Sequence, residues 1–376
     1  MKIQIKFAAC ALLLATINPQ LSTCFAQGSL TPPGTPAPTM KTLDQVEARS
    51  PISSLPYTIS QPGSYYLTTN LTGSSGASGI IISSGSVTLD LNGFALTGVA
   101  GSTNGIRVSN VYTNITVRNG TVNGWGKTGV YAPLAVSSQF IDLRASDNGL
   151  GGIVGGQGNN LIRCVAANNQ LLGLTSDSGS TFQDCTATGN LGDGFDASNG
   201  GQAFNDCTAT GNTNYGFFIG GWGLVNKCTA NGNGSSGFRG GRGARFSECH
   251  ASQNGQAGFD AGYGNSVSGC TTSDNTGDGI TVGYRCFIHN NECYANGAAV
   301  NGAGIHLTLG GSRIEGNHVA ENYYGIKADV AGNFIIHNSA SGNTADFSIT
   351  GSQSIGPIVS GDSMITTNNP WANFSF

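Results

Sequence analysis

Apolar and polar residues recur along this chain with a step of 21 or 22 residues. A glycine followed by an apolar residue marks eleven successive repeats, and from Gly152 to Gly279 the step never departs from that length. Between these glycines, apolar and polar residues alternate with a period of two, which is typical of short β-strands. Such a repeat predicts a solenoid whose coils contact only their neighbours. The pairs begin at Gly105, Gly129, Gly152, Gly173, Gly194, Gly216, Gly237, Gly258, Gly279, Gly304 and Gly325.

A second signature, apolar-x-x-Cys-x-Ala-x-x-Asn, places identical residues in columns. Because parallel strands lie about 4.8 Å apart, residues with the same index stack in neighbouring coils. The Asn column predicts buried amides that bond one another and the turn backbone. The Cys column predicts free buried thiols, since parallel side chains suit neither a disulfide nor a zinc site. These columns contain Cys164, Cys185, Cys207, Cys228, Cys249 and Cys270, and Asn148, Asn169, Asn190, Asn212, Asn233, Asn254, Asn275, Asn296, Asn322 and Asn343.

An inward Asn ladder, three short strands per coil and stacked aromatic residues resemble the right-handed parallel β-helix of the pectate-lyase-like superfamily. The residue pattern of the repeat is similar to that of repeats in periplasmic proteins of the NosD and carbohydrate-binding or sugar-hydrolase type. The resemblance covers residues 80–349 and implies an all-β solenoid of about eleven coils. That scaffold hosts lyases, hydrolases, epimerases, adhesins and phage spikes, so fold alone leaves function open. The catalytic motifs of pectate lyases, Arg-x-Pro-x-x-Arg, and of polygalacturonases, Asn-Thr-Asp, are absent from the sequence.

The regions outside the repeat have different compositions. Residues 1–26 read as a signal peptide, because lysines precede an apolar run that is too short to span a bilayer. A lipid anchor at Cys24 is the alternative, which the preceding Thr23 fits poorly. We therefore expect a secreted protein, extracellular or periplasmic. Residues 27–50 predict a Pro-rich spacer and a short helix, residues 51–79 N-terminal strands, and residues 350–376 a C-terminal cap.

Composition narrows the choice of partners. The chain has 59 glycines, only 10% charged residues and a net charge of -4. This leaves no basic excess for neutralising a phosphate backbone, so we expect no nucleic-acid partner. We expect no cofactor, and calcium, although conceivable, has no motif to support it. The sequence leaves open whether the protein is a monomer or a trimer.

The residue after each Gly-apolar pair points outward and forms a candidate strip. Aromatic rings beside charged groups on such a strip suit a polysaccharide, whose sugars offer apolar faces and, in uronates, carboxylates. The alternative is a solvated sheet with weak surface ion pairs. The candidate catalytic residues are Arg239, Asp260, His306 and Lys327. The candidate substrate-binding residues are Asp196, Phe218, Trp222, Arg242, Tyr263, Tyr284 and Arg285.

The spacing between coils limits the reactions that residues in different coils can catalyse together. Asp196 and Asp260 lie three coils apart, or about 14 Å, which exceeds the separation that paired-carboxylate glycosidases need. A uronate lyase or epimerase instead needs a cation for the carboxylate and a base for the neighbouring carbon. The sequence therefore predicts a protein that binds or acts on polysaccharide, with a lyase or epimerase preferred if it is an enzyme. A non-catalytic surface, adhesin or spike-like protein is the alternative.

Overall fold

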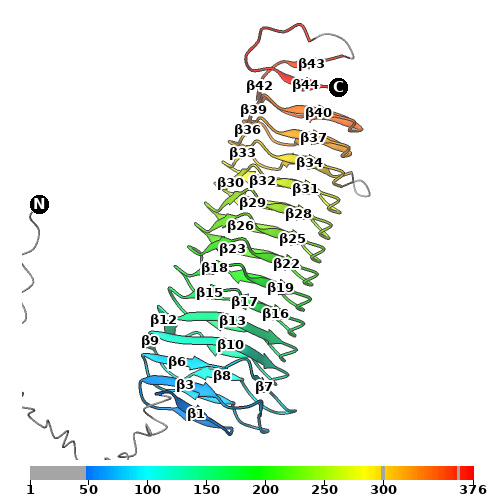
Figure 1. Ribbon diagram of the computed structural model, residues 1–376. Coiled ribbons are helices and arrows are strands. Elements are labelled where there is room, and N and C mark those ends of the chain that lie inside the picture. The colour runs from blue at the N-terminus through cyan, green and yellow to red at the C-terminus, as the bar shows by residue number, and fades with distance from the viewer. Residues whose placement is uncertain (1–47, 298–300, 362–364) are drawn as a thin grey trace, which may run out of the picture. The chain divides into compact units, whose positions relative to one another are not determined.

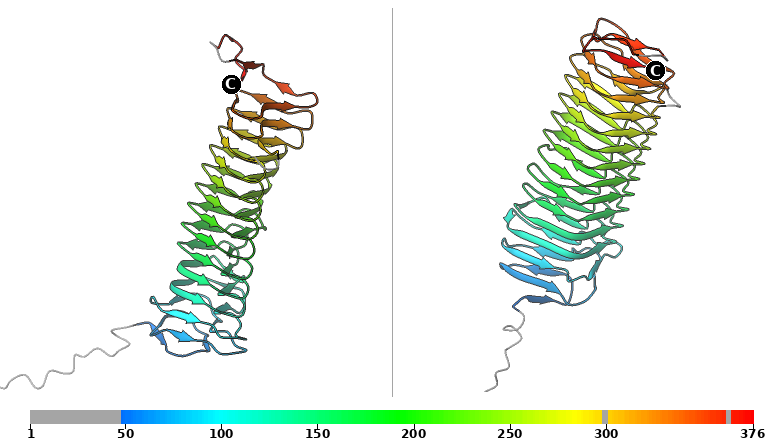
Figure 2. Two further views of the ribbon diagram at one scale, coloured as in Figure 1. Left: turned by 90° about the vertical axis from the view of Figure 1, so that its right-hand side faces the viewer. Right: turned by 45° about the horizontal axis from the view of Figure 1, so that its top comes forward.

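A computed structural model describes residues 48–297, 301–361 and 365–376. Residues 49–376 form one compact unit in which the described chain winds through 44 strands and no helix. The strands stack coil upon coil into a right-handed parallel solenoid (Figures 1 and 2). The predicted signal peptide, the spacer and most of the predicted short helix lie outside the described residues.

One face of the solenoid is a parallel sheet of 14 strands, with one strand from each coil. These are β2 (Tyr57–Ile59), β5 (Ile80–Ile82), β8 (Ile106–Val108), β11 (Val130–Ala132), β14 (Ile153–Gly155), β17 (Leu174–Thr175), β20 (Phe195–Ala197), β23 (Phe217–Gly221), β26 (Phe238–Arg242), β29 (Phe259–Tyr263), β32 (Ile280–Tyr284), β35 (Ala303–Leu307), β38 (Tyr324–Ala328) and β41 (Ala345–Ile349).

The other strands form a 28-stranded sheet made of two parallel ladders, which are joined where β10 (Ile115–Asn123) and β13 (Gln139–Ser146) run through both. Ladder one contains β1 (Ser50–Ile52), β3 (Gly63–Leu67), β6 (Val87–Asp90), β15 (Asn160–Ile162), β18 (Thr181–Gln183), β21 (Ala203–Asn205), β24 (Leu224–Asn226), β27 (Arg245–Ser247), β30 (Ser266–Ser268), β33 (Phe287–His289), β36 (Arg313–Glu315), β39 (Phe334–Ile336) and β42 (Ser354–Ile355). Ladder two contains β4 (Leu71–Thr72), β7 (Ala95–Thr97), β16 (Val165–Ala167), β19 (Thr186–Thr188), β22 (Thr208–Thr210), β25 (Thr229–Asn231), β28 (His250–Ser252), β31 (Thr271–Ser273), β34 (Glu292–Tyr294), β37 (His318–Ala320), β40 (Ser339–Ser341), β44 (Asn373–Ser375) and β43 (Ile358–Ser360). A small separate sheet pairs β9 (Tyr112–Thr113) with β12 (Ala135–Val136).

The predicted fold class is confirmed, and the number of coils is larger than predicted. The 14-stranded sheet contains three strands beyond the eleven Gly-apolar pairs, namely β2, β5 and β41. Strand β2 follows Pro56 and β41 follows Thr344, so neither carries the glycine that indexed the repeat. Strand β5 does follow a glycine, Gly79, and belongs to the same column as the counted pairs.

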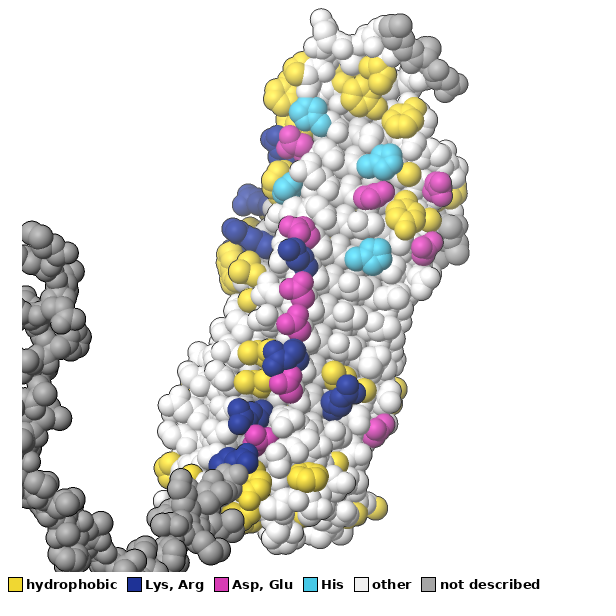
Figure 3. Space-filling view, viewed as in Figure 1, with side chains coloured by type: hydrophobic (Ala, Val, Ile, Leu, Met, Phe, Trp, Pro, Cys, Tyr) yellow, Lys and Arg dark blue, Asp and Glu magenta, His cyan; other side chains and the backbone are white. Residues whose placement is uncertain are grey.

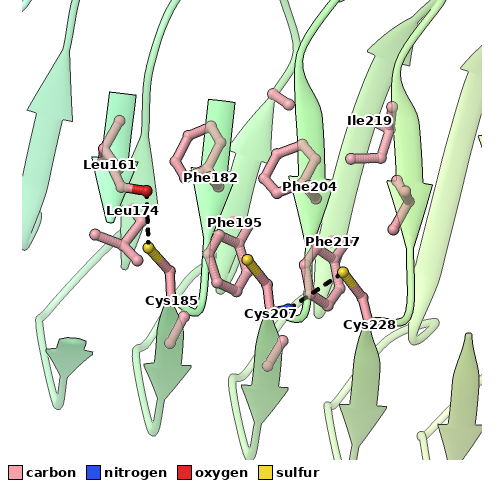
Figure 4. Packing of buried hydrophobic residues seen from close by; sticks show 14 of the residues in the cluster. Leu161, Leu174, Phe182, Cys185, Phe195, Phe204, Cys207, Phe217, Ile219 and Cys228 are labelled. Atoms are coloured by element: carbon pink, nitrogen blue, oxygen red, sulfur yellow. Dashed lines mark hydrogen bonds between the residues drawn. The ribbon is translucent and has the colours of Figure 1, made fainter. Parts of the chain in front are cut away.

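Stacked phenylalanines fill the middle of the solenoid, as the alternation predicted. The rings of Phe195 and Phe217 lie 4.6 Å apart and nearly parallel, and those of Phe182 and Phe204 lie 4.5 Å apart. The two stacks meet edge to face, with Phe195 and Phe204 5.7 Å apart (Figure 4). Each buried ring contributes on the order of 1.5–3 kcal/mol, so these aromatic residues stabilise the fold and are not exposed to a ligand.

The cysteines form a second buried column beside the phenylalanines. All eight cysteines of the described chain are free and buried. Their sulfur atoms contact backbone groups of neighbouring coils. The Cys185 thiol lies 3.4 Å from the carbonyl oxygen of Leu161, and the backbone amide of Cys207 donates to the sulfur of Cys228 (Figure 4). The predicted free thiols are therefore confirmed, and they pack as small apolar groups.

Burial should make these thiols unreactive in the folded protein. Burial raises the pKa of Cys293 to about 12, and it also raises the pKa of Cys286. Since the thiolate is the nucleophile, a thiol-reactive disulfide reagent should label almost none of them in native protein. After denaturation without a reductant, all eight of these cysteines should react. Two or fewer reactive thiols in that second titration would show that the column is oxidised.

The Asn ladder explains why a glycine stands at or near the start of most strands of the 14-stranded sheet. Each ladder amide donates to the side-chain oxygen of the next, as Asn212 donates to Asn233 at 3.0 Å. A Cβ added at Gly216 would lie 2.6 Å from the carbonyl oxygen of Gly237 and 2.8 Å from the Asn233 amide nitrogen. The amide column and the neighbouring coil thus leave no room for a side chain at this position.

A row of charged side chains of both signs follows the turn between the two ladders from coil to coil (Figure 3). Arg163 and Asp142 form a two-bond contact at 2.7 and 2.9 Å, and Lys227 lies 3.9 Å from Glu248. All of these side chains are about half exposed or more, so each pair contributes under about 1 kcal/mol. This row of charges is therefore a solvated edge of the solenoid and not a binding or catalytic site.

Candidate functional site

The outward residues of the 14-stranded sheet lie in one register, which we call the outer strip. Each pairs with the same position of the next coil, as Asp196 pairs with Phe218, Arg239 with Asp260, and His306 with Lys327. The alternation therefore placed these residues on one face correctly. The strip runs through Arg107, Tyr131, Val154, Thr175, Asp196, Phe218, Arg239, Asp260, Thr281, His306 and Lys327.

Arg239 is the centre of the first cluster on the strip. Its guanidinium donates to the Tyr215 hydroxyl and lies 5.2 Å from the centre of that ring. It also lies 5.8 Å from the ring of Phe218, which stacks on Tyr215. The Asp260 carboxylate is 3.8 Å away and about a third exposed. Arg239 is thus oriented by aromatic rings and only loosely paired with a carboxylate, so it can accept an anionic ligand.

Two carboxyl groups near this cluster hold protons more tightly than usual. Burial raises the pKa of Asp260, and the charge of Arg239 opposes that increase only in part. Burial also raises the pKa of Asp193, whose carboxylate accepts a hydrogen bond from the Tyr215 amide at 3.0 Å. Both carboxyl groups are therefore protonated more readily than an ordinary aspartate.

His306 forms the second cluster and is held between two carboxylates. Its Nδ1 lies 2.9 Å from Asp278, and its Nε2 lies 2.8 Å from Asp329. Lys327 lies 3.4 Å from the same Asp329 oxygen. Burial alone would lower the pKa of His306, but hydrogen bonding to the two carboxylates outweighs it, and the pKa is raised. Both ring nitrogens are held by carboxylates, so neither is free for use as a base.

This cluster should make the stability of its coils depend on pH in both directions. The pKa of His306 is raised above the ordinary value of 6.5, so its stabilisation is complete below that value and is lost as pH rises through the folded-state pKa. The pKa values of Asp278 and Asp329 are lowered, mainly through His306 in the case of Asp329, so their stabilisation is lost as pH falls below about 3.8.

We predict that a His306→Gln variant loses the alkaline part of this pH dependence. The measurement is the free energy of unfolding of wild type and variant across neutral and mildly alkaline pH. The control is His250→Gln, because His250 lies on ladder two, away from this cluster. Parallel pH curves for wild type and His306→Gln would contradict the arrangement.

Five predicted binding residues meet at the edge of the 14-stranded sheet, which we call the aromatic ridge. Arg242, Tyr263 and Tyr284 are paired in register. Trp222 and Arg285 occupy the following turn with positive φ angles of 58° and 56°. The ridge consists of Trp222, Arg242, Tyr263, Tyr284 and Arg285.

Cations and rings alternate along the ridge. Arg242 lies 5.9 Å from the ring of Trp222 and 5.1 Å from that of Tyr263, and Arg285 lies 4.8 Å from the ring of Tyr284. Trp222 is 68% exposed, and a Cβ on Gly243 would lie 2.7 Å from its ring, so the indole lies flat on the next coil. Exposed rings oriented by guanidinium groups form a ready surface for stacking a flat ligand.

A groove of about 700 Å³ runs along the other side of this ridge, over the outer face of ladder one. Its lining includes Leu224 and Phe287, which are 52% and 38% exposed, together with the cations Arg245 and Arg285. Sequence reasoning did not place this groove, because its residues belong to a different strand column from the outer strip.

The structure separates the four candidate catalytic residues into two pairs. Arg239 contacts Asp260, while His306 and Lys327 share Asp329. Three register steps separate Arg239 from His306, which corresponds to about 14 Å. The four residues therefore do not converge on one reacting group.

Sequence reasoning missed Tyr215, Asp278 and Tyr324, which hold the predicted residues in place. Tyr215 supports Arg239, Asp278 fixes His306, and the Tyr324 ring lies 5.6 Å from the Lys327 ammonium. All three stand directly before the repeat glycine, Tyr215 and Asp278 in the turn that leads into the sheet and Tyr324 at the start of β38. Tyrosine and aspartate recurring at that index, with Asp193 as a further example, were the available signal.

The strip, the ridge and the coil geometry describe a right-handed parallel β-helix with a basic and aromatic flank. Residues 59–224 and 197–345 match the model of the right-handed β-helix region, so the chain belongs to that family. No curated protein matches the sequence significantly.

Solved structures with a similar fold have very different sequences. The A-module of mannuronan C-5 epimerase AlgE4 from Azotobacter vinelandii aligns with a TM-score of 0.51 and 16% identity, over 79% of this chain and 91% of that chain. The Dettilon tailspike protein aligns with a TM-score of 0.50 and 12% identity, over 75% of this chain and 61% of that chain. At these identities the likeness shows the fold alone. Among the described residues, no helix is long and apolar enough to cross a membrane.

Proposed function

We propose that this protein is exported and binds an acidic, uronate-containing polysaccharide along the outer strip and the aromatic ridge. The observation that carries the proposal is the alternation of guanidinium groups and exposed rings from Trp222 through Arg242 to Tyr263. Stacking of sugar faces on rings and bidentate pairing of carboxylates with arginine require this combination. The name of one similar structure, an epimerase of mannuronan, agrees with a carbohydrate ligand.

The direction of the polymer follows from the register. Both surfaces extend along the solenoid axis, with one position in every coil of about 4.8 Å. A polymer lying along that axis meets Arg239 on the strip and Arg242 on the ridge in the same strand, β26. Repeated weak contacts along a repeating ligand then add to the affinity without a deep pocket.

If the protein is catalytic, Arg239 marks the centre. Its guanidinium would pair with a uronate carboxylate and so favour loss of the proton from the adjoining carbon. Asp260, whose pKa burial raises, would accept that proton. Departure of the neighbouring glycosidic oxygen, with a proton taken from water, would give a lyase product. Delivery of a proton from water to the opposite face of the carbon would give an epimer. The separation of carboxylates along the strip disfavours paired-carboxylate hydrolysis.

Purified protein should be tested on polyuronates and on neutral polysaccharides in two assays run side by side. We expect retardation in affinity electrophoresis with the polyuronate gels only. Ultraviolet absorbance of a new carbon–carbon double bond reports a lyase, and proton exchange into the polymer from deuterated water reports an epimerase. Retardation without either signal means a binding protein. No retardation on any polyuronate contradicts the proposal and favours a structural surface or spike-like role.

A further inference from the structure

We propose that a second anion-binding subsite lies near the N-terminal end of the outer strip, where Arg107, Lys127 and Tyr131 bind a carboxylate-bearing sugar of the same polymer. The inference rests on the proposed function and extends it to a part of the face where no candidate residue was placed. Arg107 and Tyr131 are neighbours in register on β8 and β11.

The three residues surround a hollow of about 410 Å³ on the surface. Arg107 and Lys127 stand at its edge and are exposed, while Tyr131 and Leu150 are 39% and 43% exposed. The apolar surface of Tyr131 and Leu150 therefore faces solvent beside two cations. A sugar ring with a carboxylate matches this pairing of an apolar face and positive charge.

The charge in this hollow is not neutralised by the protein. Its lining residues include no aspartate or glutamate, and within the described chain neither Arg107 nor Lys127 forms an ion pair. Arg239 and Lys327, by contrast, each lie within 3.8 Å of a carboxylate. An anion that enters the hollow gains attraction without displacing an internal partner.

Polar groups at the base of the hollow are fixed by their own bonds. The hydroxyls of Ser78 and Thr103 lie 2.7 Å apart, and the side-chain oxygen of Asn104 accepts the Thr128 amide at 3.2 Å. The Asn104 oxygen is thus engaged, and its amide nitrogen remains available as a donor. A ligand would find hydroxyl and amide groups arranged before it arrives, which lowers the entropic cost of binding.

The register fixes the distance between this subsite and the Arg239 cluster. Six steps separate Arg107 from Arg239 along the strip, which amounts to roughly 29 Å. Short oligomers can occupy only one of the two positions. A long oligomer can occupy both and should bind more tightly because its second contact is intramolecular.

The test is a titration calorimetry comparison of a galacturonate trisaccharide and a galacturonate dodecasaccharide at low ionic strength. The test variant combines Arg107→Gln with Lys127→Gln. The matched control combines Arg144→Gln with Lys227→Gln, which removes the same charge from residues outside the 14-stranded sheet. We expect the test variant to lose about tenfold in affinity for the dodecasaccharide and the control to keep the wild-type affinity.

The outcomes separate the subsite from the proposed function. Dodecasaccharide binding by the test variant within about twofold of wild type would overturn the subsite and leave the proposed function intact. An equal loss in the control would overturn it too, because net charge alone would then explain the effect. No binding by wild type would overturn both. If dextran sulfate binds as tightly as galacturonate and loses as much in the test variant, the site recognises charge and not a uronate, which also contradicts the proposal.

Discussion

Replacing Asn233 by alanine should lower the free energy of unfolding by about 2–4 kcal/mol, the largest stability effect we expect from one polar side chain. The Asn233 oxygen accepts both the backbone and side-chain amides of Asn212, at 3.1 and 3.0 Å. Its amide donates to the Ala209 carbonyl at 3.2 Å and to Asn254 at 3.0 Å. Alanine would leave several of these buried groups without partners, because the column is closed to water.

The control for this variant is Asn214→Ala, which lies in the preceding coil, two residues after the ladder residue Asn212. Asn214 is exposed, and no hydrogen bond of its side chain occurs among the described residues. Urea denaturation followed by circular dichroism should give a lower midpoint for Asn233→Ala and an unchanged one for Asn214→Ala. Equal midpoints for Asn233→Ala and wild type would mean that the ladder amides contribute little to stability.

A Trp222→Ala, Arg242→Ala double variant should lose on the order of 10- to 100-fold in affinity for a polyuronate. Trp222 offers the most exposed ring of the ridge, and Arg242 lies between it and Tyr263. Both side chains are on the surface, so the variant should fold normally. Affinity electrophoresis with wild type alongside measures the loss.

The matched control for that variant is Trp371→Ala. Trp371 is 50% exposed but lies against His337 near the C-terminus, with ring centres 5.6 Å apart. Its removal should leave polyuronate affinity unchanged. A loss as large in Trp371→Ala as in the ridge variant would mean that the polymer does not bind at the ridge.

The repeat allowed the fold and the outward columns to be predicted in detail. Identical indices must stack in a solenoid, so Asp196, Phe218 and Arg239 could be assigned to one column from spacing alone. The end strands β2 and β41 were left out of the coil count because they lack the glycine that indexed the repeat. The number of coils was therefore underestimated at the ends of the solenoid, where the repeat glycine is missing.

The contacts that define the clusters could not be predicted from spacing. Tyr215 reaches Arg239, and Asp278 reaches His306, from turns whose side-chain directions depend on local backbone angles. A column index gives the coil and the face of a residue, but not whether its side chain crosses to the neighbouring coil. The same limit concealed the contacts of His306 with two carboxylates, those of Asp278 and Asp329.

The distance between the two charged clusters indicates what kind of ligand they can bind. Arg239 and His306 are about 14 Å apart, each with its own carboxylates, which suits several contacts with one extended ligand better than one catalytic centre. Arg107 and Lys127, which form no ion pair within the described chain, extend this pattern toward the N-terminal coils. We therefore expect the polymer to bind along the solenoid axis.

Hydroxyl-radical footprinting with and without a galacturonate dodecasaccharide tests this claim most directly. The three tryptophans provide internal standards, since Trp125 is buried while Trp222 and Trp371 are exposed. We predict that the ligand protects Trp222, Tyr263 and Tyr284 from oxidation and leaves Trp371 unchanged. Unchanged oxidation of Trp222 under saturating ligand, or protection of Trp371 instead, would contradict binding along this flank.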